Sequence, residues 1–413
     1  MAGVPIAIIE TNILPRLPAE SLPNFKLVCK SFNVLISSPE FMEEHCKRSI
    51  STNTGRLVIL NTNRGFHVFN YDSLDSPPFY LPFPDNFSRR VYIFGSSNGL
   101  MCLGNRNAGS MYSYYDLMLL NPLTGMFFKV PSPEITVTWA IESYGFGFDD
   151  WTKDYKIARI LETHESRSVM VYSLHANSWK TVMSDSHQKS DELKPHDNGT
   201  LINNHLLHWI FTDYVQDHPN NRIENNSRIG CFDLRTDEWV DNVGLPHDFD
   251  STPGCYNQCE TLGVFDGRLC LLTRSRLEPH LTCVDMWVMM KYGVRDSWVK
   301  LLGVSDSCVT SSLQICPLGM AYGSKHDMLL VRGTKHTIPG ANRVVLIWYN
   351  MHQKKSRLSQ VHKVHNLPQQ FYDVCTCIKT LVPLPRDTRI RKTPPPLPEK
   401  QPSTLEIFSH SRY

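Results

Sequence analysis

Residues Asn12 to Phe41, NILPRLPAESLPNFKLVCKSFNVLISSPEF, decide how the rest of the chain is interpreted. One apolar stripe of a helix is predicted by residues at offsets of 0, 3, 7, 10 and 14, namely Leu22, Phe25, Cys29, Phe32 and Ile36. A helical cluster of about 45 residues is too small to bury one core comfortably. We therefore expect a partner or the following domain to cover part of its apolar surface.

The ends of these helices carry their own signals. Ser21 is a candidate N-cap, and Pro23 fits the first turn that follows it. The run SSPE, residues 37–40, predicts a further helix start in which an early proline precedes a glutamate that completes a capping box. Ile13, Leu14 and Leu17 form a shorter apolar face before Pro18. The stretch is thus expected to form short helices and the start of another.

The order of residues in this stretch resembles the F-box of plant F-box proteins. The resemblance rests on Leu17-Pro18, Ser21-Leu22, Val28-Cys29-Lys30-Ser31, Phe32, Leu35-Ile36-Ser37 and Pro39-x-Phe41. The chain departs from the family at Val4-Pro5, Asn12 and Phe32, where Leu-Pro, Glu and Trp are usual.

Length and composition limit the class of protein. A chain of 413 residues with 41% hydrophobic content has room for two or three domains with a real core. Its 42 Lys and Arg against 40 Asp and Glu give a charge of +2, so no nucleic-acid-binding footprint is expected. Because no apolar run approaches the length of a membrane span, we expect no membrane association and a location in the cytoplasm and/or nucleus.

The 12 cysteines are scattered singly, and none of them forms a Cys-x-x-Cys pair. Most stand in apolar runs such as GRLCLL and GLMCL, where a thiol acts as a small buried hydrophobe. We therefore expect reduced, structural cysteines and no metal site.

Past residue 50, short alternating runs separated by Gly, Asn, Asp and Pro predict strands and turns. A turn followed by an apolar strand recurs as SNGLMCL, NNHLLHWI, FDGRLCLL and KHDMLLV, with a weaker copy in TGRLVIL. A second strand with a polar turn follows each time, at Asn121, Ser173, Asp233, Met289 and Asn350. These positions are 52, 60, 56 and 61 residues apart, a spacing typical of propeller blades.

We therefore expect an α+β multidomain chain in which a short helical module precedes a mainly antiparallel, all-β, propeller-like domain. About six blades are predicted, with up to eight possible, and Leu381–Leu384 is expected to close the ring by pairing with the first strand. The expected boundaries are 4–48 for the helical module, 54–384 for the propeller and 386–413 for a flexible, basic, proline-rich tail. The alternative is an open pair of β-sandwich sheets.

A second resemblance covers the repeat region. GSSNGLMCL, LLNPLTG, SYGFGFDDWTKDYKIARI, VMVYSLHANSWKTV and RIGCFDLRTDEW look like successive landmarks of the plant F-box-associated, kelch-like domain. The chain lacks the Gly-Gly pair of true kelch blades, so kelch-like here describes architecture only.

We find no arrangement of residues typical of a catalytic site. His164-Glu165 lacks the second His of a zinc-protease helix, and YGFGFD at 144–149 lacks the third glycine and the helix of a phosphate-binding loop. Aromatics flanking glycine are better explained by packing at a blade edge. Most of seven tryptophans stand at equivalent strand positions, which favours a role in the core: Trp139, Trp179, Trp209, Trp239, Trp287, Trp298 and Trp348. We expect no enzyme activity and no cofactor.

The resemblance implies a substrate-recognition subunit of an SCF-type ubiquitin ligase, which binds a Skp-type adaptor and through it a cullin. The adaptor contacts that it implies are Pro5, Ile9, Leu14, Leu17, Pro18, Leu22, Val28, Cys29, Lys30 and Phe32. Because Leu22, Cys29 and Phe32 also lie on the apolar stripe, we expect the set to divide between adaptor contacts and internal core. The unknown target protein would bind loops of the propeller, roughly 184–199, 213–227, 247–260, 303–318 and 332–342. Two alternatives remain open: a non-degradative scaffold, and a propeller that binds a glycan or small molecule with the helices as a packing cap.

Overall fold

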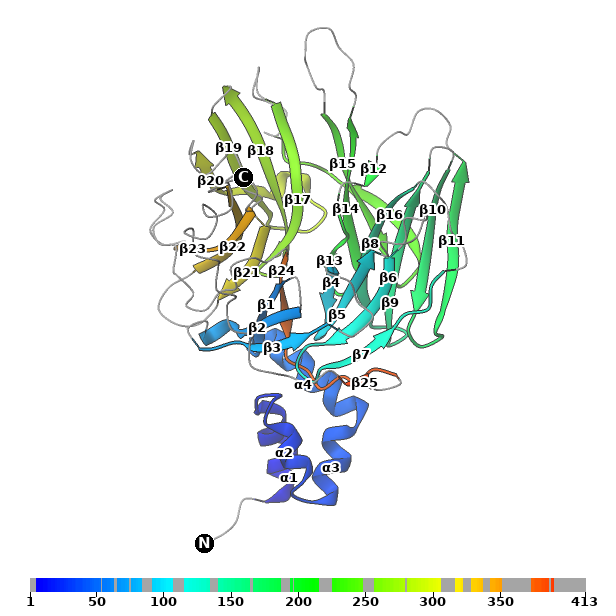
Figure 1. Cartoon of the computed structure of the whole chain (residues 1–413), viewed down its shortest axis with the longest axis vertical. Coiled ribbons are helices and arrows are strands. Elements are labelled where there is room, and N and C mark those ends of the chain that lie inside the picture. Colours follow the sequence, from blue (N-terminus) through cyan, green and yellow to red (C-terminus); the bar gives the residue numbers. More distant parts are fainter. Residues whose placement is uncertain are drawn as a thin grey trace, which may run out of the picture.

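The structure of the protein is a computed structural model. It describes residues 5–52, 54–62, 65–73, 76–83, 91–106, 115–133, 140–163, 166–186, 194–195, 197–214, 225–247, 256–278, 281–305, 316–321, 328–336, 342–350, 373–385 and 388–389. A helical module stands below a ring of β-sheets (Figure 1).

The helical module begins with α1 (Ile6–Ile8), which runs into a π-helical turn η1 (Ile9–Ile13) and a 3₁₀ turn η2 (Leu14–Arg16). Three helices follow, α2 (Leu22–Lys26), α3 (Lys30–Ser37) and α4 (Pro39–Ser51). Its core is a cluster of five buried side chains: Leu14, Leu22, Phe32, Ile36 and Phe41. The expected series of short helices before the repeats is confirmed.

The apolar stripe from Leu22 to Ile36 does not lie on one helix, because the chain breaks between α2 and α3 at residues 27–29. Cys29 is the N-cap of α3: its sulfur accepts a hydrogen bond from the Phe32 amide at 3.5 Å, and its side chain is exposed. The prediction that Cys29 shares a helical stripe was wrong, since a residue with extended backbone can sit at a cap but not inside a helix.

Two cap predictions also need correction. Ser21 makes no cap bond, because its hydroxyl donates to the Pro18 carbonyl oxygen at 2.7 Å. Ser38 caps α4 by accepting from the Phe41 amide at 3.2 Å, so the N3 position belongs to Phe41 and Glu40 lies one residue too early to complete a capping box.

In the described part of the chain, the β-domain consists of antiparallel strands in six sheets. In chain order the strands are β1 (Arg56–Asn61), β2 (Gly65–Asn70), β3 (Phe79–Pro82), β4 (Val91–Ser97), β5 (Leu100–Arg106), β6 (Tyr115–Asn121), β7 (Met126–Lys129), β8 (Ile141–Asp149), β9 (Asp154–Glu162), β10 (Ser166–Ser173), β11 (Ser178–Ser186), β12 (Lys194–Pro195), β13 (Thr200–Ile202), β14 (Leu206–Tyr214), β15 (Asn225–Asp233), β16 (Glu238–Val243), β17 (Tyr256–Phe265), β18 (Arg268–Glu278), β19 (Leu281–Met289), β20 (Trp298–Ser305), β21 (Cys316–Ala321), β22 (Met328–His336), β23 (Asn342–Asn350), β24 (Asp373–Ile378) and β25 (Thr388–Arg389). Short 3₁₀ turns η3 (Tyr71–Ser73) and η5 (Arg295–Ser297) lie between strands.

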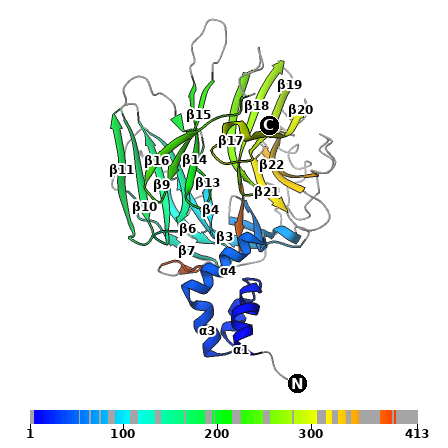
Figure 2. The same cartoon turned by 180° about the vertical axis from the view of Figure 1, so that it is seen from behind.

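The sheets form a closed ring. Successive sheets contact one another through one strand each, in the order β24, β4, β8, β13, β17, β21 and back to β24. Figure 2 shows the same arrangement from behind. Five sheets have the four strands of a propeller blade or more, and the sheet β21-β22-β23 has three among the described residues. The propeller-like architecture is therefore confirmed over the sandwich alternative, with five complete blades described where about six were expected.

The ring closes through the two ends of the repeat region. β24 pairs along its whole length with β1, from Arg56 opposite Ile378 to Asn61 opposite Asp373. The expectation that Leu381–Leu384 would close the ring was wrong, because the closing strand ends at Ile378. Residues 381–384 instead run past β6, where the Asn121 side-chain amide donates to the Thr380 and Val382 carbonyl oxygens at 3.1 and 3.0 Å.

Part of the predicted C-terminal tail also belongs to the sheet. β25 pairs with β7, with Thr388 opposite Phe127 and Arg389 opposite Met126. The other residues from Arg386 to Tyr413 lie outside the described part of the chain.

The repeated turns share one backbone conformation. Asn98-Gly99, Asn203-Asn204 and Asp266-Gly267 have positive φ at both residues, the requirement of a type I′ hairpin turn. Gly99 is also spatially required, since a Cβ there would lie 2.0 Å from the Thr380 methyl carbon. Because Asn, Asp and Gly tolerate this backbone better than other residues, the sequence repeat marks the hairpins.

Apolar clusters fill the space between consecutive sheets. One cluster joins the sheets of β4–β7 and β8–β11 through side chains such as Leu117 and Phe146, and another joins β8–β11 to the next sheet through Ile160 and Trp209. Gly145 and Gly147, of the YGFGFD run, lie on β8 at the edge of its sheet, where a Cβ would clash with side chains of the next sheet. The interpretation of this run as blade-edge packing is confirmed.

Tryptophans of the outer strands connect neighbouring sheets. The Trp179 indole N–H donates to the Pro131 carbonyl oxygen at 2.7 Å, and that of Trp298 donates to the Gly244 carbonyl oxygen, also at 2.7 Å. Trp209, Trp287 and Trp298 are buried. Their expected structural role is confirmed, whereas Trp139 and the side chain of Trp348 lie outside the described part of the chain.

Candidate interaction surfaces

The ten residues predicted to contact an adaptor divide by exposure. Leu14, Leu22 and Phe32 are buried in the core of the helical module, with 0%, 1% and 9% of their surface exposed. Ile9 and Leu17 are half-buried against that core. The remaining five are exposed: Pro5, Pro18, Val28, Cys29 and Lys30. Side chains of the first group can shape the module, while those of the last group are accessible to a partner.

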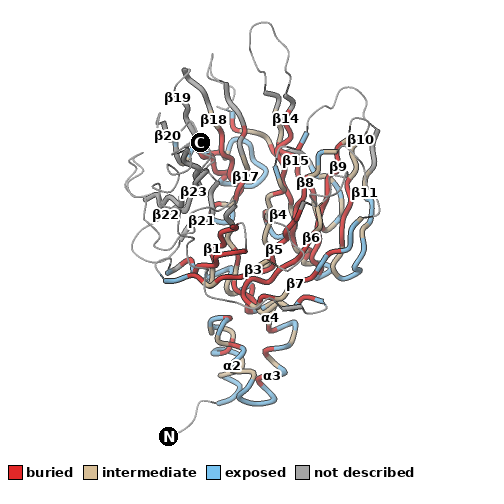
Figure 3. The backbone as a smooth tube through the Cα atoms, in the orientation of Figure 1, coloured by how far each residue is buried: buried red, intermediate tan, exposed pale blue. Residues whose placement is uncertain are grey.

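Exposed apolar side chains stand on α1, on α3 and in the turn between α2 and α3. We call Ile6, Leu27, Val28 and Val34 the distal apolar surface; they are 64%, 85%, 66% and 72% exposed. Figure 3 shows exposed backbone where α2 passes into α3, at the end of the module farthest from the sheets. The Ser31 hydroxyl donates to the Glu10 carboxylate at 2.9 Å and joins α3 to η1 beside this surface. Several exposed apolar side chains on so small a module are typical of a protein-binding surface.

Sequence reasoning singled out Val28 but missed Ile6, Leu27 and Val34. These residues fall off the apolar stripe that guided the prediction. Apolar residues that lie off the buried stripe of so small a module have no core to enter, and this pattern is visible in the sequence.

The junction between the module and the ring is built from α4 and the segment after β24. His45 of α4 is buried, and its Nε2 lies 2.8 Å from the Leu17 carbonyl oxygen. Leu381 packs against the core of the module, and Lys379 donates to the Glu20 carboxylate at 2.7 Å. Lys153, in the turn between β8 and β9, bonds to Glu43 of α4 at 2.5 Å. The ring therefore covers part of the module's apolar surface, as predicted from the small size of the module.

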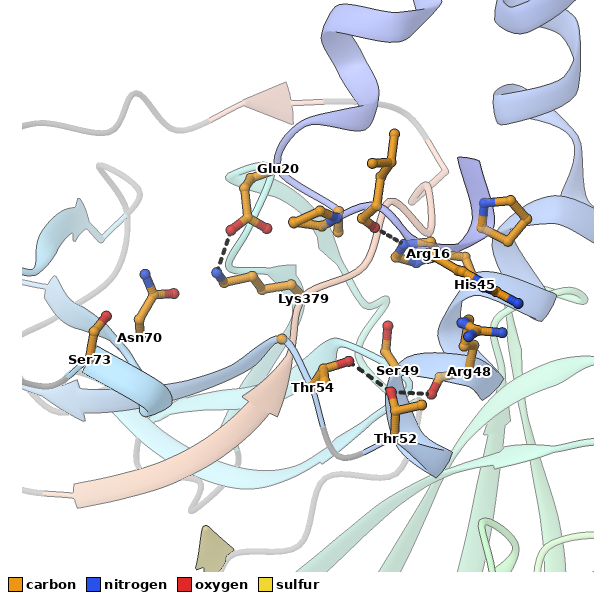
Figure 4. Close-up of a pocket in the computed structure, with 15 residues that line it drawn as sticks. Arg16, Glu20, His45, Arg48, Ser49, Thr52, Thr54, Asn70, Ser73 and Lys379 are labelled. Atoms are coloured by element: carbon orange, nitrogen blue, oxygen red, sulfur yellow. Dashed lines mark hydrogen bonds and ion pairs between the residues drawn. The ribbon is translucent and has the colours of Figure 1, made fainter. Parts of the chain in front are cut away.

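A cavity of about 460 Å³ lies within this junction (Figure 4). Residues 15–20 line one part of it, residues of α4 another, and Gly55, Asn70, Ser73 and Lys379 of the ring a third. Two of the predicted adaptor contacts, Leu17 and Pro18, line this junction cavity. They thus lie near the ring, apart from the distal apolar surface.

The face of the ring opposite the helices carries the strand ends from which the predicted target-binding loops leave. The Asn98-Gly99 turn and the turn between β8 and β9 lie on the helix side, since Gly99 approaches Thr380 and Lys153 reaches α4. Antiparallel strands alternate in direction, so the connections at the other strand ends lie on the far face, as Figure 1 shows. Most residues of the five predicted loops lie outside the described part of the chain.

Buried charges in the β8–β11 sheet are paired with each other. Arg159 bonds to Glu142 at 2.6 Å, with their side chains 1% and 3% exposed, and the Tyr144 hydroxyl donates to Glu142 at 2.6 Å. Burial beside this carboxylate raises the pKa of Tyr144 well above its ordinary value. Lys156 lies 3.2 Å from Asp149 and 3.0 Å from Asp237. Charges paired in this way within the core suit a structural role.

A buried histidine lies deeper in the ring. His208 is fully buried, and its Nε2 lies 2.7 Å from the Tyr292 hydroxyl oxygen. Burial lowers the pKa of His208 to about 4, so its imidazole is neutral at pH 7. The Tyr292 oxygen also lies 3.4 Å from the sulfur of Cys231, whose pKa burial raises to about 11. A neutral imidazole beside a protonated thiol is not an activated nucleophile.

Cysteines of the described residues are mostly buried, as expected: Cys46, Cys102, Cys231, Cys259, Cys270 and Cys377. Within the described ranges no group of three or more His, Cys, Asp or Glu residues could hold a metal ion. Among the same residues, no helix is both long enough and apolar enough to cross a membrane. His164 and Glu165 lie outside them.

Comparison with protein families assigns both parts of the chain. Residues 11–44 match the F-box domain, and residues 47–382 match the F-box-associated beta propeller domain. F-box protein CPR1 of Arabidopsis thaliana is 29% identical over 378 residues, covering 86% of this chain and 84% of that protein. An F-box/kelch-repeat protein of Arabidopsis thaliana is 26% identical over 320 residues, covering 73% of this chain and 79% of its own length.

Solved structures are similar only at the level of general shape. An α-L-arabinofuranosidase from Fusarium graminearum matches with a TM-score of 0.41 and 10% identity over 70% of this chain and 85% of its own. A likeness this distant carries no argument about activity. The F-box helices, the propeller that follows them and the match over residues 47–382 together place this chain in the family of plant F-box proteins with an F-box-associated β-propeller domain.

Proposed function

We propose that the protein is the target-recognition subunit of an SCF-type ubiquitin ligase. Its F-box would bind a Skp-type adaptor, and through it a cullin, while the propeller holds a target protein for ubiquitination and degradation. The observation that carries the proposal is the opposite placement of two surfaces. Leu27 and Val28 of the distal apolar surface stand in the turn between α2 and α3, at the end of the module away from the ring. The strand ends that flank the predicted target-binding loops lie on the far side of the ring.

The exposed part of the predicted contact set gives the adaptor a place to bind. Val28 and Cys29 lie between α2 and α3, Lys30 is the first residue of α3, and Pro5 immediately precedes α1. Val28 and its neighbour Leu27 offer apolar surface, which a helical groove of a partner can bury. Leu14, Leu22 and Phe32 would hold these residues in position from the core.

The junction would fix the position of the ring, and of a target bound to it, relative to the adaptor. Lys379 to Glu20, Lys153 to Glu43 and the packing of Leu381 join the module to the ring. A target held on the far face would then occupy a defined position relative to the ubiquitin-loaded enzyme. The rate of ubiquitin transfer would come from proximity, and the chain itself would catalyse nothing.

We propose that β21-β22-β23 is a sixth blade of this ring, and that the protein works in the cytoplasm and/or nucleus.

Capture of the adaptor tests the first step. Val28→Asp places a charge on the distal apolar surface without touching the core and should lower co-precipitation of a Skp-type adaptor at least about tenfold. The matched control is Val299→Asp, a half-exposed valine of the ring, 50% exposed, which should leave capture unchanged. Equal capture by both variants would refute the assigned surface.

The fate of the target separates this proposal from a non-degradative scaffold. Proteins captured by the chain lacking its F-box should become more abundant when the full-length protein is depleted. A cullin absent from the precipitate, or captured proteins whose lifetime does not change, would favour the scaffold instead.

A further inference from the structure

The junction cavity has the size of a ligand site. Its volume of about 460 Å³ lies within the range of small-molecule pockets. Its walls come from segments far apart in sequence: the turn after η2, the C-terminal half of α4, and the ring near Gly55 and Lys379. Whatever occupies the cavity would touch the F-box and the propeller together.

Positive charge in the cavity exceeds negative charge. The lining includes Arg16, Arg48 and Lys379 but only one carboxylate, that of Glu20. That carboxylate is held by Lys379 at 2.7 Å. Neither Arg16 nor Arg48 has an ion pair or a side-chain hydrogen bond to another residue in the described ranges. Two guanidinium groups thus border the same cavity without a counter-charge.

Neutral polar groups complete the lining. Ser49, Thr52, Thr54, Asn70 and Ser73 add hydroxyl and amide groups. The Thr52 hydroxyl donates to the Arg48 carbonyl oxygen at 2.8 Å and lies 2.8 Å from the Thr54 hydroxyl oxygen. In Figure 4, Arg16, His45 and Arg48 lie on one side of the cavity, and Asn70 and Ser73 on the other.

We propose that the junction cavity binds a small phosphorylated molecule with two or more anionic groups. Arg16 and Arg48 would hold its phosphates, because the planar guanidinium fork matches phosphate oxygens in pairs and stays charged at every physiological pH. The hydroxyl and amide groups across the cavity would hydrogen-bond its uncharged part. A ligand bound there would join the F-box to the propeller and fix the direction in which the far face points.

This inference does not depend on adaptor binding, since it concerns the isolated chain. The probe is inorganic pyrophosphate, titrated into the full-length protein at constant ionic strength and followed by calorimetry and by the unfolding temperature. Saturable binding and a rise in unfolding temperature are expected. Monophosphate should bind more weakly, because it carries one phosphate group where pyrophosphate carries two.

Three variants make the test specific. Arg16→Gln and Arg48→Gln should each weaken pyrophosphate binding about tenfold, the usual effect of losing one charge-assisted bond. Lys47→Gln removes a charge from the same helix outside the cavity, where Lys47 pairs with Glu43 at 2.7 Å, and should change nothing. Arg16 is exposed, so its substitution leaves the core intact and keeps the test valid if Arg48→Gln impairs folding.

Two results would overturn the proposal. One is the absence of saturable binding; the other is equal binding by the wild type and the Arg16→Gln variant. If Arg16→Gln instead lowers adaptor capture in phosphate-free buffer while pyrophosphate binding is unchanged, the cavity cations serve a protein partner and the small-molecule site is refuted.

Discussion

The helical module and the propeller bury their apolar residues in different ways. The module has one cluster of five buried side chains, and it needs Leu381 from the far end of the chain to cover it. The ring repeats one unit, so one sheet covers the next, as apolar clusters show between successive sheets from β24-β1-β2-β3 round to β17–β20 in the described residues. Repeated sheets bury one another's apolar faces, whereas a short helical module needs residues from elsewhere in the chain to cover its core.

The difference predicts where each part should fail. The ring depends on closure, because an open ring leaves two sheets with an uncovered face. The module depends on a few side chains, because each is a large fraction of its core. Both depend on the segment of Asp373–Leu381, which closes the ring and then packs against the helices.

The largest effect is expected from removing that segment. A chain that ends at residue 370 lacks β24, so β1 loses its partner from Arg56 to Asn61, and the module loses Lys379 and Leu381. We expect the cooperative thermal transition to disappear. Circular dichroism during heating measures this, and a chain that ends at residue 390 is the control that should melt like the wild type. A truncated chain that still melts cooperatively would show that β24 does not close the ring.

A smaller effect, confined to the module, is expected from Leu14→Ala. Leu14 is fully buried, and truncation of a buried leucine lowers the free energy of unfolding by about 2–5 kcal/mol. In a core this small the loss should unfold the helices locally and leave the ring folded. Amide hydrogen exchange should then increase in residues 5–52 and stay unchanged in β5 and β9. Val34→Ala, at a side chain that is 72% exposed, should change exchange in neither part.

The smallest of these effects concerns acid stability of the ring. Because the pKa of His208 is about 4 in the folded protein and about 6.5 in an unfolded chain, the unfolded state binds more protons between these values. The free energy of unfolding should therefore fall as the pH drops from 6.5 to 4, by no more than about 3 kcal/mol from this residue. Urea unfolding between pH 4.5 and 7 should show a weaker pH dependence in His208→Gln. His175→Gln, at an exposed side chain, should keep the wild-type slope.

The strands and hairpins of the ring could be predicted in detail. The turns at Asn98-Gly99 and Asp266-Gly267 need positive φ, and the residue types that allow it are visible in the sequence. The same holds for the loops of the second hairpins, where the Asn121 side chain accepts from the Leu123 amide and Asp233 from the Arg235 amide. Such contacts span only a few residues, so local sequence carries them.

Predictions that needed distant contacts were less successful. Cys29 fitted the helical stripe by spacing, but tertiary packing ends α2 before it and exposes its side chain as a cap. The stretch 381–384 had the apolar character of a closing strand, but residues 373–378 reach β1 first. The adaptor-contact set mixed buried and exposed side chains, because a resemblance to a family transfers positions and not exposure.

The sequence by itself determined that short helices precede a ring of repeated antiparallel hairpins, and that this order belongs to F-box proteins. Helix stripes, turn residues and repeat spacing all act over short separations or recur regularly. The tertiary structure alone decided which helical residues remain exposed, which strand closes the ring, and where a cationic cavity forms. Each of these depends on residues brought together from opposite ends of the chain, as when Glu20 meets Lys379 across 359 positions.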